Sequence, residues 1–574
     1  MPRSLLWLAL LCHVVFATSH ALATPCCEGP DENDHYTYAW IVANAGRLPL
    51  SPGLAAARSL PVTDGAALAH HPPLYYLLLA GVLTASGRDD TVLAAALNPA
   101  FGDPQQASRY LKFRHGSGQG EGPLRALRLV SVLLGAITLW LVHRLARVLC
   151  PAQPRIADLA ALLIACLPMW SFLHGVLNSD VLATTLSAAT TLALVRLLQA
   201  DTVRAAHGVR LGTLLGLAWL TKLTTLFLGV LTAAVFVVVF VRRRRVGRSG
   251  EVWRAAAWTA SLTLLLAGWW FVRNQLLYGD PLGLSVHDEG FPLIPPEYRW
   301  NWLTRSFPAT VFSSLLGRFG WFILPPYPAL VWLATGVAVA ALFGLGLALR
   351  ASERHRADAH APRSLWLLLA AMTLVFAGTA HFNWTAPQPQ ARLLFPAIGP
   401  AAIVLAAGLV RLSTTWRRRR WLVALLPATT AVVFFAWYRP AFDPALAPAD
   451  PSHRTFVGGI VDDLGPMGIR WREPLPTVPC TSPPSLHWDE ADAPAGARYT
   501  LYVYDGHGRV WMATHEWGGD RLVLDQGSVQ LPELVFAQLP TGVDVLLKLR
   551  RVPSTADEDP TMLPTSPPLP FRRG

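Results

Sequence analysis

Charge is scarce in this 574-residue chain, and that scarcity decides the class of protein. Charged residues make up 15% of the sequence and hydrophobic residues 52%, whereas a soluble domain carries about 25% charged residues. A purely soluble enzyme is therefore excluded, and the same composition excludes disorder for most of the chain. Cysteine is scarce as well, since six residues without a CxxC pair make no disulfide framework. The adjacent Cys26 and Cys27 receive no role, because a bridge between neighbouring residues is strained.

Lysine is nearly absent, so the net charge of +12 comes from arginine. The only lysines are Lys112, Lys222 and Lys548. A basic chain can bind nucleic acid, but here the arginines form short clusters between apolar runs, where they report membrane topology. We therefore expect a polytopic α-helical membrane protein that binds no nucleic acid.

Ten apolar runs are candidates for membrane spans. The run Leu211–Val241 has about thirty-one residues, too many for one span of ~20, and Thr221-Lys222 interrupts it. We expect two short helices there with a turn at Lys222, which gives about eleven spans. The first run could also be a cleaved signal peptide, because Ala21-Leu22-Ala23 resembles a cleavage site; we favour an uncleaved helix. The runs are Leu5–Ala23, Leu124–Leu141, Ile156–Leu173, Val181–Leu198, Leu211–Val241, Ala255–Phe271, Tyr327–Leu349, Leu365–Ala380, Leu393–Leu409 and Trp421–Trp437.

Five arginine clusters test this predicted membrane topology. If the N-terminus is inside, all five clusters lie on the cytoplasmic side. This requires that the apolar stretch Leu74–Leu83 does not span, and we expect it to be a helix lying at the outer interface. The clusters are Arg144, Arg147 and Arg155; Arg196, Arg204 and Arg210; Arg242 to Arg245 with Arg248 and Arg254; Arg350, Arg354, Arg356 and Arg363; and Arg411 with Arg417 to Arg420.

The composition changes after Arg439. A proline-rich start is followed by short, partly alternating runs such as Tyr499–Tyr504 and Val543–Leu549, and Asp505-Gly506 is typical of a hairpin turn. We expect a small β-sandwich-like domain outside the membrane, without chemistry of its own. The predicted organisation is an all-α transmembrane domain at 1–440, with a large first outer loop at about 24–123, and a proline-rich linker with the β domain at 441–574.

Acidic residues avoid the middle of the apolar runs and gather just outside their ends. A coupled transporter usually needs ionisable groups near the midplane, so this placement favours chemistry at the outer surface. Asp31, Glu32, Asp34 and His35 lie together in one stretch of five residues after the first span. Crowded carboxyls raise one another's pKa, so one of them could act as a general base, although a solvated helix-capping cluster is the plainer alternative.

Other outer segments supply a second acid and several cations. Asn178-Ser179-Asp180 lies at another outer turn, where Asp180 could instead only cap its helix. A lysine in an apolar turn is costly without an anionic partner, and phosphate is a natural partner for Lys and Arg. Carboxylates for a hydroxyl, cations for a phosphate and an apolar surface for a tail together indicate a lipid-phosphate substrate. The candidate phosphate or headgroup ligands are His71, Lys222, Arg273 and Arg392. Asp34 and His35 are candidate substrate-binding residues as well.

A set of motifs occurs in a fixed order over about residues 1–440. They are Asp31-Glu32 with His35-Tyr36 and Ala39; His71-Pro72-Pro73-Leu74; Asn178-Ser179-Asp180; Leu220-Thr221-Lys222; Trp270–Asn274 with Leu277–Gly283; and Gln390–Pro396. The set resembles GT-C membrane glycosyltransferases, in particular the bacterial branch related to protein O-mannosyltransferases and aminoarabinose transferases. In one departure, His71 stands where that branch has lysine.

The resemblance implies a polyprenyl-phosphate sugar donor and a GT-C-like fold. It implies that Asp31 or Glu32 takes the acceptor proton, that the anomeric carbon is inverted, and that Asp180 orients donor or acceptor. Lys222, Arg273 or Arg392 would meet the phosphate charge. The acceptor, a lipid, glycan or protein, stays open. We expect no certain cofactor, with a divalent metal as an alternative whose ligands would come from Asp31, Asp34, His35, His70 and His71.

The expected location is the bacterial plasma (inner) membrane, with the catalytic face extracytoplasmic. The alternative function is a lipid-linked-sugar transporter or a membrane scaffold without catalysis. The transporter would move lipid across vesicles without a new glycosidic bond, whereas the enzyme would lose sugar transfer on replacement of Asp31 by asparagine.

Overall fold

The computed structural model describes a helical part up to residue 439 and a β part from residue 469. Cys26 and Cys27 and most of the predicted first loop lie outside the described residues. These are 5–25, 28–51, 54–55, 58, 68–86, 121–290, 294, 296, 299–320, 326–354, 362–386, 388–412, 416–439, 469–472, 480–491, 493, 497–504, 510–513, 524–525, 527–531, 536, 544–551 and 569–572.

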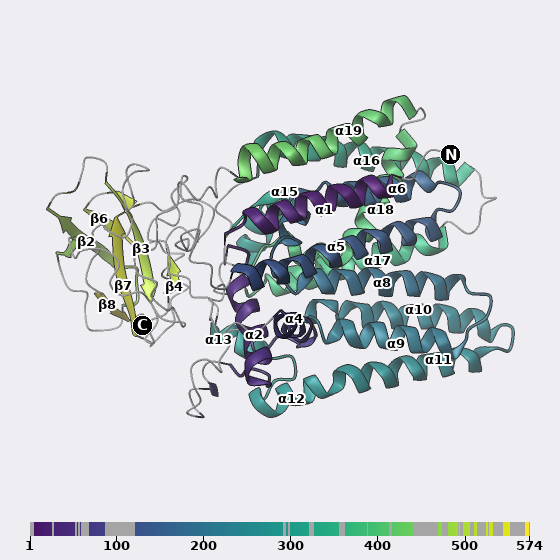
Figure 1. Ribbon diagram of the computed structural model, residues 1–574, viewed down its shortest axis with the longest axis horizontal. Coiled ribbons are helices and arrows are strands. Elements are labelled where there is room, and N and C mark those ends of the chain that lie inside the picture. Colours follow the sequence, from purple (N-terminus) through teal and green to yellow (C-terminus); the bar gives the residue numbers. More distant parts are fainter. Residues whose placement is uncertain are drawn as a thin grey trace.

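The helical part is a bundle of long helices with shorter ones at one end. Figure 1 shows α1, α5, α8, α9, α10 and α11 running side by side, with α2, α4 and α12 gathered at one end of them. The helices are α1 (Leu6–Ala23), α2 (Glu32–Ala45), α4 (Leu74–Ala85), α5 (Glu121–Leu149), α6 (Pro154–Ala165), α7 (Pro168–Leu173), α8 (Asp180–Gln199), α9 (Ala205–Trp219), η2 (Leu223–Thr225), α10 (Phe227–Arg244), α11 (Ser249–Thr263), η3 (Leu264–Gly268), α12 (Trp269–Tyr278), α13 (Leu284–Gly290), α14 (Arg299–Asn301), η5 (Trp302–Ser306), α15 (Phe307–Gly317), α16 (Pro328–Arg354), α17 (Pro362–Phe382), η6 (Ala391–Ala397), α18 (Ile398–Leu412), α19 (Trp416–Val432) and η7 (Val433–Tyr438).

Eight helical segments among the described residues are long and apolar enough to cross a membrane. The predicted all-α polytopic class is confirmed, and each of the eleven predicted spans falls on helix. Three of them are shorter than a full span: the α6–α7 pair, α9, and the apolar segment Ala424–Tyr438. The helix α4 has 12 residues, too few to span, in agreement with its predicted place outside the set of spans.

Two breaks in these helices have local causes. The predicted span Ile156–Leu173 is interrupted at Leu167, which is extended (φ −80°, ψ 119°) before Pro168 at the start of α7. The second break is the predicted turn at Lys222, whose backbone is also extended. There the amide of Leu74 donates to the carbonyl of Leu220, so the start of α4 is fixed against the end of α9.

The long helices pack closely because small residues face one another. At the α9–α11 contact, the hydroxyl of Thr259 donates to the carbonyl of Gly208, and Thr263 donates to Gly212. A Cβ atom at Gly208 would collide with the carbonyl oxygen of Ala255. Such glycine-lined contacts are typical of helices that associate in membranes.

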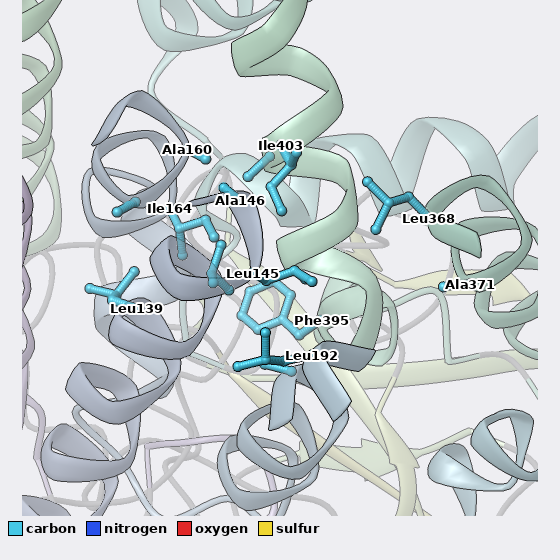
Figure 2. Packing of buried hydrophobic residues seen from close by; sticks show 14 of the residues in the cluster. Leu139, Leu145, Ala146, Ala160, Ile164, Leu192, Leu368, Ala371, Phe395 and Ile403 are labelled. Atoms are coloured by element: carbon cyan, nitrogen blue, oxygen red, sulfur yellow. The ribbon is translucent and has the colours of Figure 1, made fainter. Parts of the chain in front are cut away.

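The main apolar core lies between α5, α6, α8, α17 and α18. Figure 2 shows the ring of Phe395 among Leu145, Leu192 and other side chains of these helices. Phe395 follows Arg392 by one turn in η6, so core packing of the ring fixes the position of the charged residue.

The β part contains two antiparallel sheets, which confirms the small β domain expected from the sequence. Leu486, Trp488, Tyr499 and Leu547 are among the side chains of its own apolar core. The predicted hairpin joins β3 to β4, which pair antiparallel, while Asp505-Gly506 lies outside the described residues. The sheets are β1-β2-β6 and β4-β3-β7-β8 with β5 on β3; the strands are β1 (Ile469–Trp471), β2 (Ser485–Glu490), β3 (Arg498–Tyr504), β4 (Val510–Ala513), β5 (Leu524–Asp525), β6 (Ser528–Gln530), β7 (Asp544–Arg551) and β8 (Leu569–Arg572). The boundary predicted at 440/441 stays a prediction.

Candidate active site

Asp31 has an unusual backbone conformation. Its φ of 59° lies in the left-handed region, and it is the one residue other than glycine with positive φ in the part of the chain that the structure describes. Aspartate and asparagine tolerate this region better than other residues. Asp31 precedes α2, yet its carboxylate makes no capping hydrogen bond to that helix. Strained backbone of this kind clusters at functional sites, and here it directs the carboxylate away from its own helix.

The carboxylate of Asp31 instead meets Arg392, which lies in η6. Nη2 of Arg392 donates to Oδ2 of Asp31 over 2.6 Å. On its other side, Nε of Arg392 lies 3.8 Å from Oδ2 of Asp180, and Nζ of Lys222 lies 2.7 Å from Oδ1 of Asp180. Four residues from four distant segments thus alternate in charge; we call Asp31, Arg392, Asp180 and Lys222 the charge cluster.

The charge cluster is closed at one end and open at the other. The side chain of Asp180 is 1% exposed and that of Arg392 is 7% exposed, whereas Asp31 is 23% exposed. Burial by itself would raise the pKa of the Asp31 carboxyl, but the charge of Arg392 brings that pKa below its usual range. Asp31 is therefore an accessible carboxylate that stays ionised at neutral pH.

Glu32 is the next residue along the chain, but its surroundings are different. Arg128 of α5 donates to both of its carboxylate oxygens, over 2.8 and 2.6 Å, and the amide of Leu177 donates to one of them. The same guanidinium donates to the carbonyls of Ala21 and Thr24. Both charged side chains are almost fully buried, at 2% and 0% exposure. Glu32 therefore ties the end of α1 to α2 and α5, and its oxygens are occupied.

His35 and His71 meet at one tyrosine. Nδ1 of His35 lies 2.9 Å from the hydroxyl of Tyr76, and Nδ1 of His71 lies 3.0 Å from the same hydroxyl. Burial lowers the pKa of His35 to about 3 and that of His71 well below its usual value, so both rings are neutral at pH 7. One hydroxyl donates a single hydrogen, so Tyr76 donates to one ring and accepts from the other. The two imidazoles are consequently opposite tautomers, and they form an uncharged hydrogen-bonding wall near Asp31.

Two predicted binding residues have partners of their own. Arg273 donates to the carbonyl of Pro49 and to the side chain of Asn274, and its guanidinium lies 4.7 Å from the ring centre of Trp270. It thus fastens the described start of the first loop to α12. Asp34, in the first turn of α2, accepts a hydrogen bond from the side chain of Asn33.

The proposed metal ligands do not assemble as a metal site. Among the described residues, no group of three or more His, Cys, Asp and Glu side chains is placed to hold a metal ion. His70 lies edge-on to His71 and His287. Asp31 and Asp180 are each held by a cation, Arg392 and Lys222. The donor set present therefore does not fit a divalent metal.

Arginines occupy the other end of the bundle. Asp180 is the first residue of α8, and Arg196 lies in the last turn of the same helix, about 24 Å away along its axis. Arg243 of α10 donates a hydrogen bond to the carbonyl of Ala200. Arg196 is close enough to Arg144 and Arg210 for their positive charges to interact. Three of the five predicted arginine clusters thus gather at the end of the bundle opposite the charge cluster. Which membrane face each end occupies stays a prediction.

Sequence reasoning missed two residues of this region, Arg128 and Tyr76. Arg128 lies inside the predicted second span, where an ionisable residue normally has a buried partner of opposite charge. Its position in the sequence could therefore have indicated a buried acidic partner. Tyr76 belongs to the Tyr75-Tyr76 pair that follows His71-Pro72-Pro73, and nothing in that pattern indicates which histidines its hydroxyl would meet.

One family model matches part of the chain. Residues 120–270 match the family model of dolichyl-phosphate-mannose-protein mannosyltransferases. The match covers α5 to the start of α12 and therefore includes Asp180 and Lys222. The resemblance to GT-C membrane glycosyltransferases that the motifs indicated is confirmed. No curated protein matches the chain at the sequence level.

Several solved structures are similar to the chain. ArnT from Cupriavidus metallidurans bound to undecaprenyl phosphate is 16% identical, with a TM-score of 0.44 over 75% of this chain and 64% of that one. The Archaeoglobus fulgidus oligosaccharyltransferase in complex with Zn and sulfate is 13% identical, with a TM-score of 0.36 over 76% of this chain and 52% of that one. The arabinofuranosyltransferase AftD from Mycobacteria is 16% identical, with a TM-score of 0.44 over 77% of this chain and 27% of that one. The chain thus spans less than two thirds of the length of each.

Proposed function

We propose that this integral membrane protein is a glycosyltransferase that moves a sugar from a polyprenyl-phosphate donor to a hydroxyl acceptor. The observation that carries the proposal is the charge cluster, which places an accessible carboxylate beside two cations at one end of an apolar bundle. The family match over residues 120–270 supports a lipid-phosphate sugar donor, because the name of that family includes such a donor, dolichyl-phosphate-mannose. The proposed place of reaction is the extracytoplasmic face of a bacterial plasma membrane, since three of the five arginine clusters gather at the other end of the bundle.

Asp31 is the proposed general base. It is the more exposed of the two carboxylates of the charge cluster, whereas the oxygens of Glu32 are occupied by Arg128 and a backbone amide. The acceptor hydroxyl would lose its proton to Asp31 as its oxygen attacks the anomeric carbon in one displacement, with inversion. A base must lie within hydrogen-bond reach of that proton, and Asp31, at 23% exposure, is the carboxylate of the charge cluster that an acceptor can reach.

The cations stabilise the leaving group. As the bond between the anomeric carbon and the phosphate oxygen breaks, the phosphate gains negative charge, which Lys222 and Arg392 would meet. Asp180 holds both cations in place, at 2.7 Å from Lys222 and 3.8 Å from Arg392, and would orient them toward the donor. The neutral wall of His35, His71 and Tyr76 offers hydrogen-bonding groups without charge, which suits the hydroxyls of a sugar. No step is assigned to a metal.

The decisive experiment is mass spectrometry of cell-envelope glycans from a deletion strain. Loss of one sugar, restored by the wild-type gene and not by an Asp31→Asn gene, would support the transferase and identify its product. An unchanged glycan profile would contradict it. Movement of lipid-linked sugar across vesicles by purified protein, without a new glycosidic bond, would instead favour a transporter.

A further inference from the structure

Arg392 stands between the proposed base and the proposed phosphate site. Its Nη2 donates to Asp31, and its buried Nε has no hydrogen-bond partner among the described residues. A guanidinium has five N–H donors in a rigid fork that fits carboxylate and phosphate equally. The contact with Asp31 thus leaves Nε of Arg392 without a hydrogen bond in the described part of the chain, on the side of the guanidinium that faces Asp180.

The charge cluster is neutral before substrate arrives. Two carboxylates, Asp31 and Asp180, face two cations, Arg392 and Lys222. An incoming phosphate therefore finds no spare positive charge unless one of these pairs opens. The pair of Lys222 with the 1%-exposed Asp180 is the buried one, so the pair of Arg392 with the 23%-exposed Asp31 is the one that can exchange.

The transfer moves one negative charge from the base to the leaving group. The acceptor O–H bond breaks and its proton goes to a carboxylate oxygen of Asp31, while the acceptor oxygen bonds to the anomeric carbon. The bond from that carbon to the phosphate oxygen breaks, and its electron pair stays on the phosphate. Asp31 thus changes from −1 to neutral, while the polyprenyl phosphate changes from a monoanionic diester toward a dianion.

We propose that Arg392 is a counter-ion shared in turn by Asp31 and the leaving phosphate. It pairs with Asp31 while the donor site is empty, and it turns to the phosphate as Asp31 accepts the proton, so one buried cation serves both partners. Lys222 stays with Asp180 throughout as a fixed positive charge. This inference rests on the proposed function, and it adds that base and lipid phosphate compete for a single guanidinium.

Competition makes a prediction that needs no knowledge of the sugar or the acceptor. Undecaprenyl phosphate, the product-like probe, must displace Asp31 from Arg392 in the wild-type protein. Asp31→Asn removes the competing charge, so it should tighten binding of the probe although it removes the base. Because the hydrogen bond to Asp31 is charge-assisted, its loss should lower the dissociation constant of the probe by about tenfold or more. Asparagine also tolerates the left-handed backbone at this position.

The experiment measures the affinity of undecaprenyl phosphate for the full-length protein in lipid nanodiscs. Arg392→Gln should weaken binding by about tenfold or more, and the double variant should bind like Arg392→Gln alone, because without the guanidinium there is nothing to compete for. Asp158→Asn, which removes one negative charge near the arginine-rich end, is the matched control and should bind like wild type. Asp31→Gly, which also fits a positive φ, should repeat the effect of Asp31→Asn.

Each outcome decides the matter. Tighter binding by both Asp31 variants, absent when Arg392 is replaced, would support the shared counter-ion. Binding by wild type that Asp31→Asn weakens or leaves unchanged would overturn it, while the transferase proposal would stand. A wild-type protein that does not bind undecaprenyl phosphate at all would overturn the lipid-phosphate donor and this inference together.

Discussion

Nη2 of Arg392 donates a 2.6 Å hydrogen bond to Asp31, across 361 positions of chain. The contact joins the start of η6 to the residue before α2. Core packing fixes one partner through Phe395, and a left-handed backbone fixes the other. Two independently fixed side chains of opposite charge, one buried and one partly exposed, form a preorganised site rather than a surface ion pair.

Replacing Asp31 by asparagine should abolish sugar transfer and leave the fold intact. An amide cannot accept the acceptor proton, and a general base typically contributes 10²–10⁴-fold, so transfer should fall by about that factor. The fold should survive because asparagine adopts positive φ readily. The rate is measured with the sugar and acceptor identified from the deletion strain, and thermal unfolding of the same preparation serves as the control. Transfer at the wild-type rate would remove Asp31 from the role of base.

Replacing Arg392 by glutamine should change the pH dependence of the reaction. The positive charge of Arg392 is what brings the Asp31 pKa below its usual range against the effect of burial. Without it, burial dominates and the pKa rises, so the acid limb of kcat/KM should move to higher pH by about one to three units. Arg392→Lys keeps a charge and should move the limb less. An acid limb that stays in place in Arg392→Gln would show that another group titrates there.

Replacing Arg128 by glutamine should destabilise the protein severely. Glu32 would keep a buried charge without its partner, which typically costs about 3–5 kcal/mol. The carbonyls of Ala21 and Thr24 would lose their donor as well. The matched control is Arg472→Gln in the β part, because Arg472 pairs with Asp489 at an exposed position where ion pairs contribute little. Equal thermal unfolding temperatures for the two variants would contradict the structural role of the Arg128 pair.

The spans and the residue types of the site were predictable from the sequence, but their pairing was not. Hydropathy locates helices because each span must satisfy its backbone internally and face lipid or other helices. The accumulation of acids and cations outside the span ends indicated Asp31, Asp180, Lys222 and Arg392 as candidates. Which acid is available and which is occupied depends on Arg128, almost a hundred positions away from Glu32, and no local pattern reports such a contact.

Replacing Tyr76 by phenylalanine should destabilise the hydrogen-bonded group of His35, His71 and Tyr76. The Nδ1 atoms of His35 and His71 would both lose the hydroxyl that they share, and a buried polar group left without a partner costs about 1–3 kcal/mol. Tyr38→Phe is the matched control, because its ring stacks on Tyr76 but its hydroxyl makes only a 3.3 Å bond to the carbonyl of His71. Thermal unfolding should show the larger loss for Tyr76→Phe, and the reverse order would refute the shared hydroxyl.

Replacing Gly408 by alanine should disrupt the packing of α18 on α16. A Cβ atom there would collide with the carbonyl oxygen of Ala341, a backbone atom that cannot turn aside. The helices would have to separate, and overpacking of this kind typically costs about 1–3 kcal/mol. Gly336→Ala in α16 is the control, since a Cβ there meets nothing within 4 Å. Alanine favours helix over glycine by up to about 1 kcal/mol, so the control should unfold at the same or a higher temperature. If Gly408→Ala is as stable as Gly336→Ala, Gly408 is not required for the close packing of α16 and α18.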